Sequence, residues 1–224
     1  MTDAHCHVRG AAARHFLASP CEESPGAGDF VFVGTHPWCA EDFDAASLES
    51  RLRADLRAGV GEIGLDRLRA RTVSQRMREV FEAQLRIASA FGRPVVLHGA
   101  KCWGEVVKTI RRLGVAATEG GGVPAFLFHG FSRSDGLLPD IAALGGFVSV
   151  GPAVLNDHAV NYRELVKKVP PERLLVETDR TPEHAAETPA LAAVAAKLAE
   201  LVGLSADALD ARLEENAAAF VRGL

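Results

Sequence analysis

Short apolar runs of strand length alternate along the chain with longer segments in which apolar residues recur every three or four positions. The clearest helical stripe follows Ser74, a good N-cap, and continues to Phe91. Strands are expected at residues 1–5, 30–35, 60–65, 94–98, 125–129, 147–150 and 174–178, with a weaker one at 15–18. Further helices are expected at residues 46–58, 103–113, 137–144, 158–168, 189–202 and 206–222. This alternation indicates βα units around a parallel sheet.

Side chains that bind metals stand where the apolar runs end. In a closed barrel of parallel strands the strand-to-helix loops meet at one face, so such residues converge there in space. The set is His5, His7, Glu62, His98, His129 and Asp179. Residues two apart share a face of an extended segment, so His5 and His7 should point inward together, as should Glu177 and Asp179.

The metal-binding side chains come from the ends of five strands. This favours a closed barrel over an open doubly wound sheet, in which a ligand site lies between only a few strands. We therefore expect a TIM-type (β/α)8 barrel. The segment 8–29 leaves room for only a weak strand, so one strand near the N-terminus should be short or distorted.

Four longer motifs surround these residues and keep a fixed order. They are Gly-Glu-Ile-Gly-Leu-Asp at 61–66, Val-Val-Leu-His-Gly at 95–99, Leu-Phe-His-Gly-Phe-Ser at 127–132 and Leu-Leu-Val-Glu-Thr-Asp at 174–179. With Gly34-Thr35-His36-Pro37-Trp38 and the segments 75–88 and 216–220, the chain resembles the TatD-like metal-dependent deoxyribonucleases, within the amidohydrolase-like barrels.

The resemblance implies a metal-dependent hydrolase with two divalent ions. His5, His7 and Asp179 with Glu62 would hold one ion, and His98 and His129 with Glu62 would hold the other, so that Glu62 is the bridge. Imidazoles with carboxylates suit Mg²⁺, Mn²⁺, Co²⁺ or Zn²⁺. Two such ions can clamp the attacking and leaving oxygens of a displacement.

Other residues near the ligands are candidates for catalysis or substrate binding. Glu62 and Asp179 are the expected catalytic residues, and Asp179 can orient the attacking water as a general base. Glu177 is expected to orient a ligand imidazole. His36 either contacts a phosphate or leaving oxygen, or anchors its loop.

Cations and aromatic residues close to the ligands offer weaker indications of the substrate. Arg67 and Lys101 either bind phosphate oxygens or are ordinary surface cations. Trp38 and Trp103 either stack on a base or pack at the barrel mouth.

Composition sets broad limits. The 224 residues, of which 48% are hydrophobic, fit one barrel domain covering 1–224. The net charge of −4 excludes a general basic field, so a polyanion must be recognised locally. The cysteines, which lack CxxC spacing, should be reduced thiols. Without a leader or an apolar run of membrane length, we expect a cytoplasmic protein with no membrane association and no evident obligate protein partner.

Three functions remain open. The first is a DNA phosphodiesterase of the TatD type that acts on DNA ends, or on another phosphoester, as an exonuclease. The second is a hydrolase of a small amide, ester or lactone, which stays open because the loop after Arg180 is shorter than the family pattern. The third is a non-catalytic metal-binding module.

Overall fold

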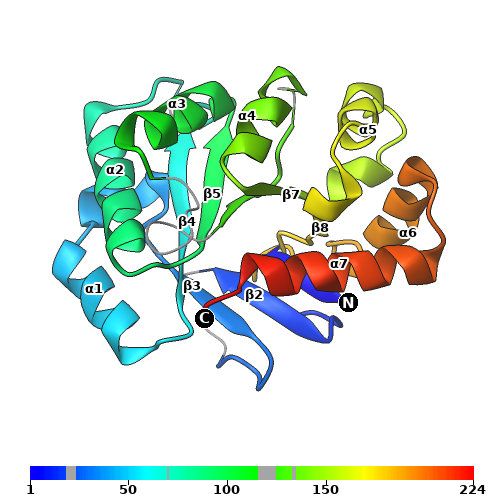
Figure 1. The fold of residues 1–224 in the computed structure, drawn as a ribbon, viewed down its shortest axis with the longest axis horizontal. Coiled ribbons are helices and arrows are strands. Elements are labelled where there is room, and N and C mark those ends of the chain that lie inside the picture. Colours follow the sequence, from blue (N-terminus) through cyan, green and yellow to red (C-terminus); the bar gives the residue numbers. More distant parts are fainter. Residues whose placement is uncertain (19–23, 70, 116–124, 133–134) are drawn as a thin grey trace.

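Eight parallel strands, hydrogen-bonded in sequence order from β1 to β8, roll into a nearly closed barrel with helices outside it (Figure 1). The computed structural model describes residues 1–18, 24–69, 71–115, 125–132 and 135–224. The strands are β1 (Thr2–Cys6), β2 (Arg14–Ala18), β3 (Phe30–Val33), β4 (Gly59–Asp66), β5 (Val95–Ala100), β6 (Phe126–Phe128), β7 (Gly146–Val150) and β8 (Leu174–Val176). The expected (β/α)8 barrel is confirmed.

The N-terminal strands differ from the expectation in one respect. β2 is a regular strand of 5 residues that pairs with both neighbours, and the shortest strands are β6 and β8, with 3 residues each. The irregularity lies in β1, whose register with β2 shifts between Asp3 and Cys6. The short or distorted strand was expected at residues 15–18; β2 is regular there, and the distorted strand near the N-terminus is β1 instead.

The helices follow the apolar stripes. The α-helices are α1 (Ala45–Ala54), α2 (Gln75–Ala90), α3 (Trp103–Leu113), α4 (Leu138–Ala143), α5 (Val160–Val166), α6 (Leu191–Val202) and α7 (Ala206–Phe220). The Ser74 side chain accepts a hydrogen bond from the backbone N–H of Met77 and so caps α2 as expected. α1 ends earlier than expected, because Asp55 takes an extended conformation ahead of β4.

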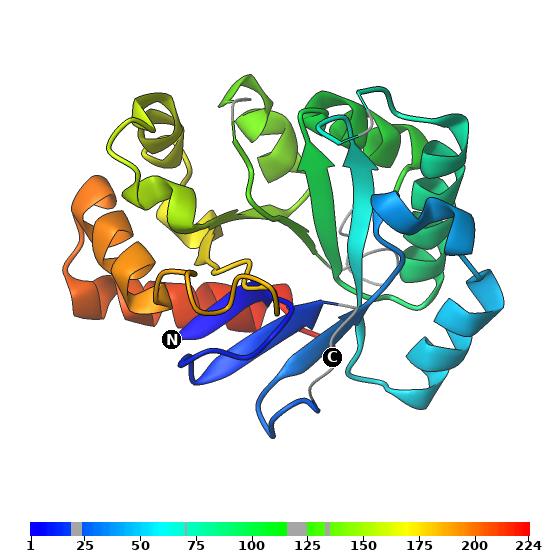
Figure 2. The same ribbon diagram turned by 180° about the vertical axis from the view of Figure 1, so that it is seen from behind.

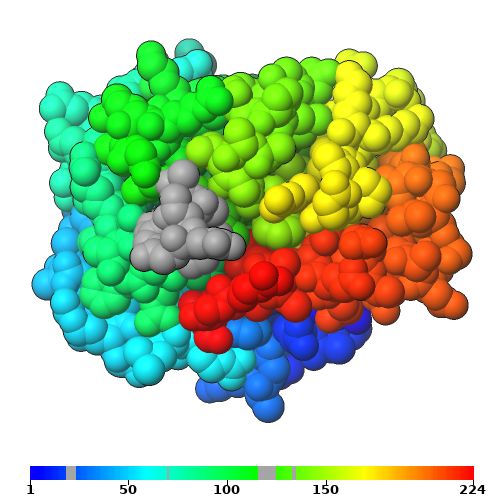
Figure 3. Space-filling model, in the orientation of Figure 1, coloured from blue at the N-terminus to red at the C-terminus, as the bar shows by residue number. Residues whose placement is uncertain are grey.

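Apolar side chains form two layers. The larger layer fills the space between strands and outer helices, and a smaller one fills the barrel interior. In the interior the Phe220 ring of α7 lies 5.7 Å from Phe16, 5.6 Å from Phe32 and 6.0 Å from Phe147, measured between ring centroids. Through Phe220, α7 thus closes the end of the barrel opposite the strand C-termini, and Figure 3 shows α7, in red, running across the lower part of the face drawn there.

Side chains and loop backbone, rather than a strand ladder, join β8 to β1 among the described residues. The Asp3 carboxylate accepts hydrogen bonds from the backbone N–H (2.9 Å) and the hydroxyl (2.7 Å) of Thr178. Beyond it, the Asp179 N–H donates to the His5 carbonyl and the His7 N–H to the Arg180 carbonyl. Figure 2 shows the golden segment after β8 against the blue β1. We call this junction the seam.

Two further predictions concern thiols and membranes. Cys6 and Cys102 are buried and lie close to the carbonyls of Phe16 and Leu65, respectively, whereas Cys21 lies outside the described residues. No helix within the described part of the chain combines the length and apolar character needed to cross a bilayer.

Candidate metal centre

The buried carboxylate of Glu62, 3% exposed, lies at the centre of a cluster of imidazoles at the C-terminal mouth of the barrel. Its two oxygens face different partners. Oε2 lies 3.3 Å from His5 Nε2 and 3.6 Å from His7 Nε2. Oε1 lies 3.6 Å from His36 Nε2 and 2.7 Å from His129 Nε2, and it also contacts His98 Nδ1. One carboxylate therefore joins two sets of nitrogen atoms.

The set on Oε2, which we call the His5 half, is completed by Asp179. Its Oδ1 lies 3.5 Å from His5 Nε2 and 3.9 Å from His7 Nε2. The side chain of Asp179 is 51% exposed, whereas that of His5 is fully buried. The His5 half thus has a buried floor and one carboxylate that reaches solvent.

The set on Oε1, which we call the His98 half, contains His36, His98 and His129. The His98 and His129 rings lie 5.6 Å apart, and those of His36 and His98 lie 4.6 Å apart. Together the two halves include all six predicted metal ligands, and they add His36 to them.

Local sequence explains why Glu62 reaches this position. β4 shifts register against β5 between Val60 and Ile63, directly around Glu62. Gly64 follows with a φ of 153°, and a Cβ there would lie 1.9 Å from the His98 carbonyl oxygen. Only glycine permits this approach of the two strands, which brings Glu62 beside His98.

Asp66, at the end of β4, fixes the orientation of His98. Its Oδ2 lies 3.0 Å from His98 Nε2 and accepts a 2.8 Å hydrogen bond from the indole N–H of Trp38. Its Oδ1 accepts from the backbone N–H groups of Leu68 and Arg69. Because a carboxylate only accepts, His98 Nε2 carries a proton toward Asp66, which leaves Nδ1, beside Glu62, as the nitrogen that would bind an ion.

The sequence reasoning did not single out Asp66. The available signal was its place as the last residue of the Gly-Glu-Ile-Gly-Leu-Asp motif at 61–66, where a strand ends like the other candidate strands.

Glu177 supports His129 from below the cluster. It is buried and accepts hydrogen bonds from the Gly130 N–H, at 2.8 Å, and from the Ser149 hydroxyl. Its Oε1 lies 3.5 Å from His129 Nδ1. The position is that of a group that orients an imidazole.

The predicted shared strand face for Glu177 and Asp179 is wrong, however. β8 already ends at Val176, and Asp179 has a φ of 49°, which turns the chain out of the extended conformation. Glu177 therefore lies beneath the cluster, and Asp179 lies at its rim.

His36 differs from the other imidazoles in its hydrogen bonding. Its Nδ1 accepts a 3.2 Å hydrogen bond from the backbone N–H of Trp38. In the neutral ring Nε2 must then carry the proton, so this atom points an N–H, not a lone pair, toward Glu62. His36 is thus a hydrogen-bond donor at the site.

The electrostatics of the cluster favour a bound cation. Burial alone would raise the pKa of Glu62, but the charges of His129 and His5 outweigh it and hold that pKa well below its usual range. Burial would likewise lower the pKa of His129, but Glu62 and Glu177 raise it well above its usual value. The pocket therefore keeps a buried anion only when positive charge accompanies it.

The residues fit a divalent ion. Both ring nitrogens of His5 are buried and lack a hydrogen-bond partner within the described part of the chain. His98 Nδ1 and Glu62 Oε1 converge at contact distance, so one ion could take both atoms as ligands. The donor set of imidazoles and carboxylates suits Zn²⁺, Mn²⁺ or Mg²⁺.

The cations and aromatic residues predicted near the ligands differ in their exposure and in their ion pairing. Lys101 is exposed at the mouth, with a φ of 57°, and forms no ion pair with a described carboxylate. Arg67 is paired with Glu105 at 2.9 Å. Trp103 is buried against Phe128 and cannot stack on a base. Trp38 is 53% exposed.

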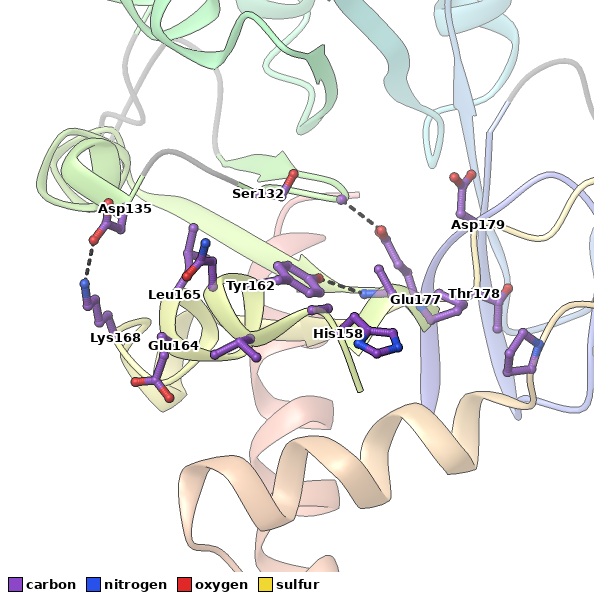
Figure 4. A pocket seen from close by; sticks show the side chains of 18 of the residues that line it. Ser132, Asp135, His158, Tyr162, Glu164, Leu165, Lys168, Glu177, Thr178 and Asp179 are labelled. Atoms are coloured by element: carbon purple, nitrogen blue, oxygen red, sulfur yellow. Dashed lines mark hydrogen bonds and ion pairs between the residues drawn. The ribbon is translucent and has the colours of Figure 1, made fainter. Parts of the chain in front are cut away.

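Two clefts open from the cluster and share Gly130, Ser132 and Asp179. One, of about 1100 Å³, extends past Glu177 and Tyr162 toward His158, and Figure 4 shows Glu177 and Asp179 at one end of it. The other, of about 750 Å³, extends past His98 toward Lys101. The centre therefore lies between two cavities, with Asp179 bordering both.

A family model described as TatD related DNase matches residues 20–222. An uncharacterized metal-dependent hydrolase of Bacillus subtilis, YabD, is 28% identical over 156 residues, which make up 67% of this chain and 59% of YabD. A protein of Edwardsiella piscicida named 3'-5' ssDNA/RNA exonuclease TatD is 30% identical over 161 residues, covering 67% of this chain and 58% of the relative. The matches thus span less than two thirds of these relatives.

Among solved structures, the TatD homologue YJJV of Escherichia coli K12 superposes with a TM-score of 0.77 at 22% identity, and the match covers 98% of this chain and 96% of that one. This likeness shows a common barrel fold.

Proposed function

The chain belongs to the TatD-related DNase family, and on that premise we propose that it is a metal-dependent hydrolase that removes nucleotides from the end of a nucleic-acid strand. The observation that carries this proposal is the position of Glu62, whose two carboxylate oxygens face separate sets of imidazoles. A carboxylate shared in this way suits a pair of divalent ions.

The two halves of the cluster divide the ligands. His5, His7 and Asp179 would hold one ion with Glu62 Oε2, and His98 and His129 would hold the other with Oε1. His129 also lies within ligand reach of His5 and Asp179, so it borders both halves. When bound, such ions attract an anionic ester, polarise its phosphorus–oxygen bonds and acidify water. Glu177 and Asp66 keep the His129 and His98 rings in orientation.

Asp179 is the proposed general base. It is the half-exposed carboxylate of the cluster, and it borders both clefts, so its Oδ1 can orient an attacking water and accept its proton. His36 Nε2–H is the proposed donor to a phosphate oxygen or to the leaving oxygen, because its proton points into the site. Lys101 would pair with a phosphate in the smaller cleft.

The two clefts support a strand as the substrate. A small metabolite needs one cavity over the reacting centre, whereas a strand continues away from the cleaved bond. Cavities of about 1100 and 750 Å³ that meet at Asp179 offer room for the leaving nucleotide and for the remaining chain. The printed name of the Edwardsiella relative, an exonuclease of single-stranded DNA and RNA, agrees with this choice.

The test is release of nucleotides from an end-labelled single strand in Mg²⁺ or Mn²⁺, with a chelator control. Asp179→Asn should lower kcat by about 10²–10⁴-fold, because it removes the proton acceptor. Asp210→Asn makes the same change at an exposed residue of α7 and should leave kcat at the native value. Native activity that survives in Asp179→Asn contradicts the mechanism. A native chain that hydrolyses small esters but no strand contradicts the substrate class.

A further inference from the structure

Trp38 is the exposed aromatic residue nearest the cluster. The large hydrophobic side chains that are exposed in the described part of the chain are Trp38, Leu56, Leu68 and Val160, and Trp38 is the aromatic one. Its ring centroid lies 4.6 Å from that of His36 and 6.4 Å from that of His98. The indole is therefore separated from Glu62 by a single layer of side chains.

Hydrogen bonds hold this exposed ring in place. The indole N–H donates to Asp66 Oδ2 at 2.8 Å, and the backbone N–H donates to His36 Nδ1. The same Asp66 oxygen contacts His98 Nε2. A ring fixed in this way loses little conformational entropy when a flat partner stacks on it, so it is organised for binding before the partner arrives.

A cation accompanies the ring. The guanidinium carbon of Arg69 lies 4.5 Å from the Trp38 ring centroid. Arg69 is exposed, and no described carboxylate forms an ion pair with it. The guanidinium lies over one face of the ring, so a base would stack on the other face or take the place of Arg69. A ring with such a cation matches the two parts of a nucleotide, since the base stacks and the phosphate pairs with the cation.

We propose that Trp38 and Arg69 form a nucleotide subsite next to the reacting centre, in which Trp38 stacks on an unpaired base and Arg69 pairs with a neighbouring phosphate. The proposal rests on the proposed function and deepens it, because it requires the substrate to carry bases close to the cleaved bond. Trp38 is then a specificity-determining residue.

The experiment compares two strands of equal charge, a short oligothymidylate and an abasic strand of the same length, as substrates in Mn²⁺. The native chain should show a KM about tenfold lower for oligothymidylate, the contribution of one stacked base. Trp38→Leu should erase that difference, so that the two strands give equal KM values. Leu56→Ala, an exposed apolar residue outside the site, should behave as the native chain does.

A second variant separates stacking from support of Asp66. Trp38→Phe keeps an aromatic ring but loses the N–H that Asp66 accepts. If stacking is the role, Trp38→Phe keeps part of the preference for oligothymidylate. If Trp38 only supports Asp66, Trp38→Phe and Trp38→Leu are equally impaired on both strands, and the proposal is overturned.

Tryptophan emission gives an independent readout, because the chain has 2 tryptophans and Trp103 is buried. Oligothymidylate should quench the native emission, the abasic strand should not, and Trp38→Phe should lose the response. Equal KM values for both strands in the native chain overturn the subsite while the strand-cleaving function stands. A native chain that cleaves neither strand overturns the proposed function and the subsite together.

Discussion

The two halves of the cluster differ in what stands behind their imidazoles. In the His98 half, His98 Nε2 contacts the Asp66 carboxylate at 3.0 Å, and His129 Nδ1 faces Glu177 at 3.5 Å. In the His5 half, both ring nitrogens of His5 are buried without a hydrogen-bond partner among the described residues, a lack that His129 Nδ1 shares despite its charge contact with Glu177. The His98 half is thus oriented by carboxylates behind its rings, through a hydrogen bond at His98 and a longer charge contact at His129.

Solvent access follows the same division. Asp179, in the His5 half, has a half-exposed side chain, while Asp66 and Glu177, behind the His98 half, are buried. The oriented half is suited to holding an ion in fixed geometry, and the open half is suited to the step in which water and substrate exchange.

Replacing the shared carboxylate should have the largest effect. Glu62→Gln removes the charge that both halves use, so metal content should fall in both, and kcat should fall by more than the roughly 100-fold that loss of an outer partner costs. Metal analysis after dialysis and the strand assay measure this. Glu79→Gln, an exposed residue of α2, is the matched control. Loss of metal from one half alone would show that Glu62 does not serve both.

Removing an outer carboxylate should affect one half. In Asp66→Asn the side-chain amide no longer accepts from His98 Nε2 as a carboxylate does, so the lone pair of Nδ1 is no longer fixed toward Glu62. Affinity for one ion should fall by about 10–100-fold, and the other should be retained. Calorimetric titration with Mn²⁺ or Zn²⁺ resolves the two. Equal weakening of both ions would contradict separate halves.

The smallest effect on the metal centre is expected when a carboxylate that contacts an imidazole outside the centre is replaced. This pair is Asp29 and His15. Asp29 accepts hydrogen bonds from the Gly26 N–H and contacts the His15 ring at 3.1 Å. Asp29→Asn should lower the unfolding free energy by about 1–3 kcal/mol at neutral pH, because it replaces a charged acceptor. Metal affinity should equal that of the native chain. Urea unfolding and the same calorimetric titration test this, and a weakened metal site would contradict it.

The pH dependence of the Asp29 contribution has a definite sign. Burial by itself raises the pKa of Asp29, but the hydrogen bonds from Gly26 and His15 outweigh it and lower that pKa below 3.8. A lowered folded pKa means that the unfolded chain binds the proton more readily, so the stabilisation is present above pH 3.8 and is lost as the pH falls through the folded pKa. The difference between native and Asp29→Asn should therefore disappear in acid.

The strands and the polar residues at their ends could be predicted because local sequence specifies both of them. A run such as Val-Val-Leu before His98 specifies a buried strand and places the next polar residue at its C-terminal end. The support of the imidazoles could not be predicted in the same way. Asp66 is close to His98 only because β4 and β5 are neighbours, and its separation of 32 residues from His98 carries no periodic signal.

The fate of Glu177 and Asp179 shows the other limit of the sequence. The period of two that places residues on one face holds only while the chain stays extended. β8 stops at Val176, and the left-handed conformation of Asp179 is a property of the loop and the seam, not of the apolar pattern. Trp103 was similarly ambiguous, because burial in the packed layer around α3 depends on the neighbours Phe128 and Phe131.

The seam between β8 and β1 also makes closure of the barrel depend on contacts between distant parts of the sequence. The hydrogen bond from Thr178 to Asp3 joins residues 175 positions apart, and the one from Asp179 to the His5 carbonyl spans a similar separation. Contacts of such long range are costly to form early in folding, so the seam should be among the last parts of the barrel to close. Asp179 belongs to the seam, so the carboxylate that would accept the proton should reach its place only when the barrel closes.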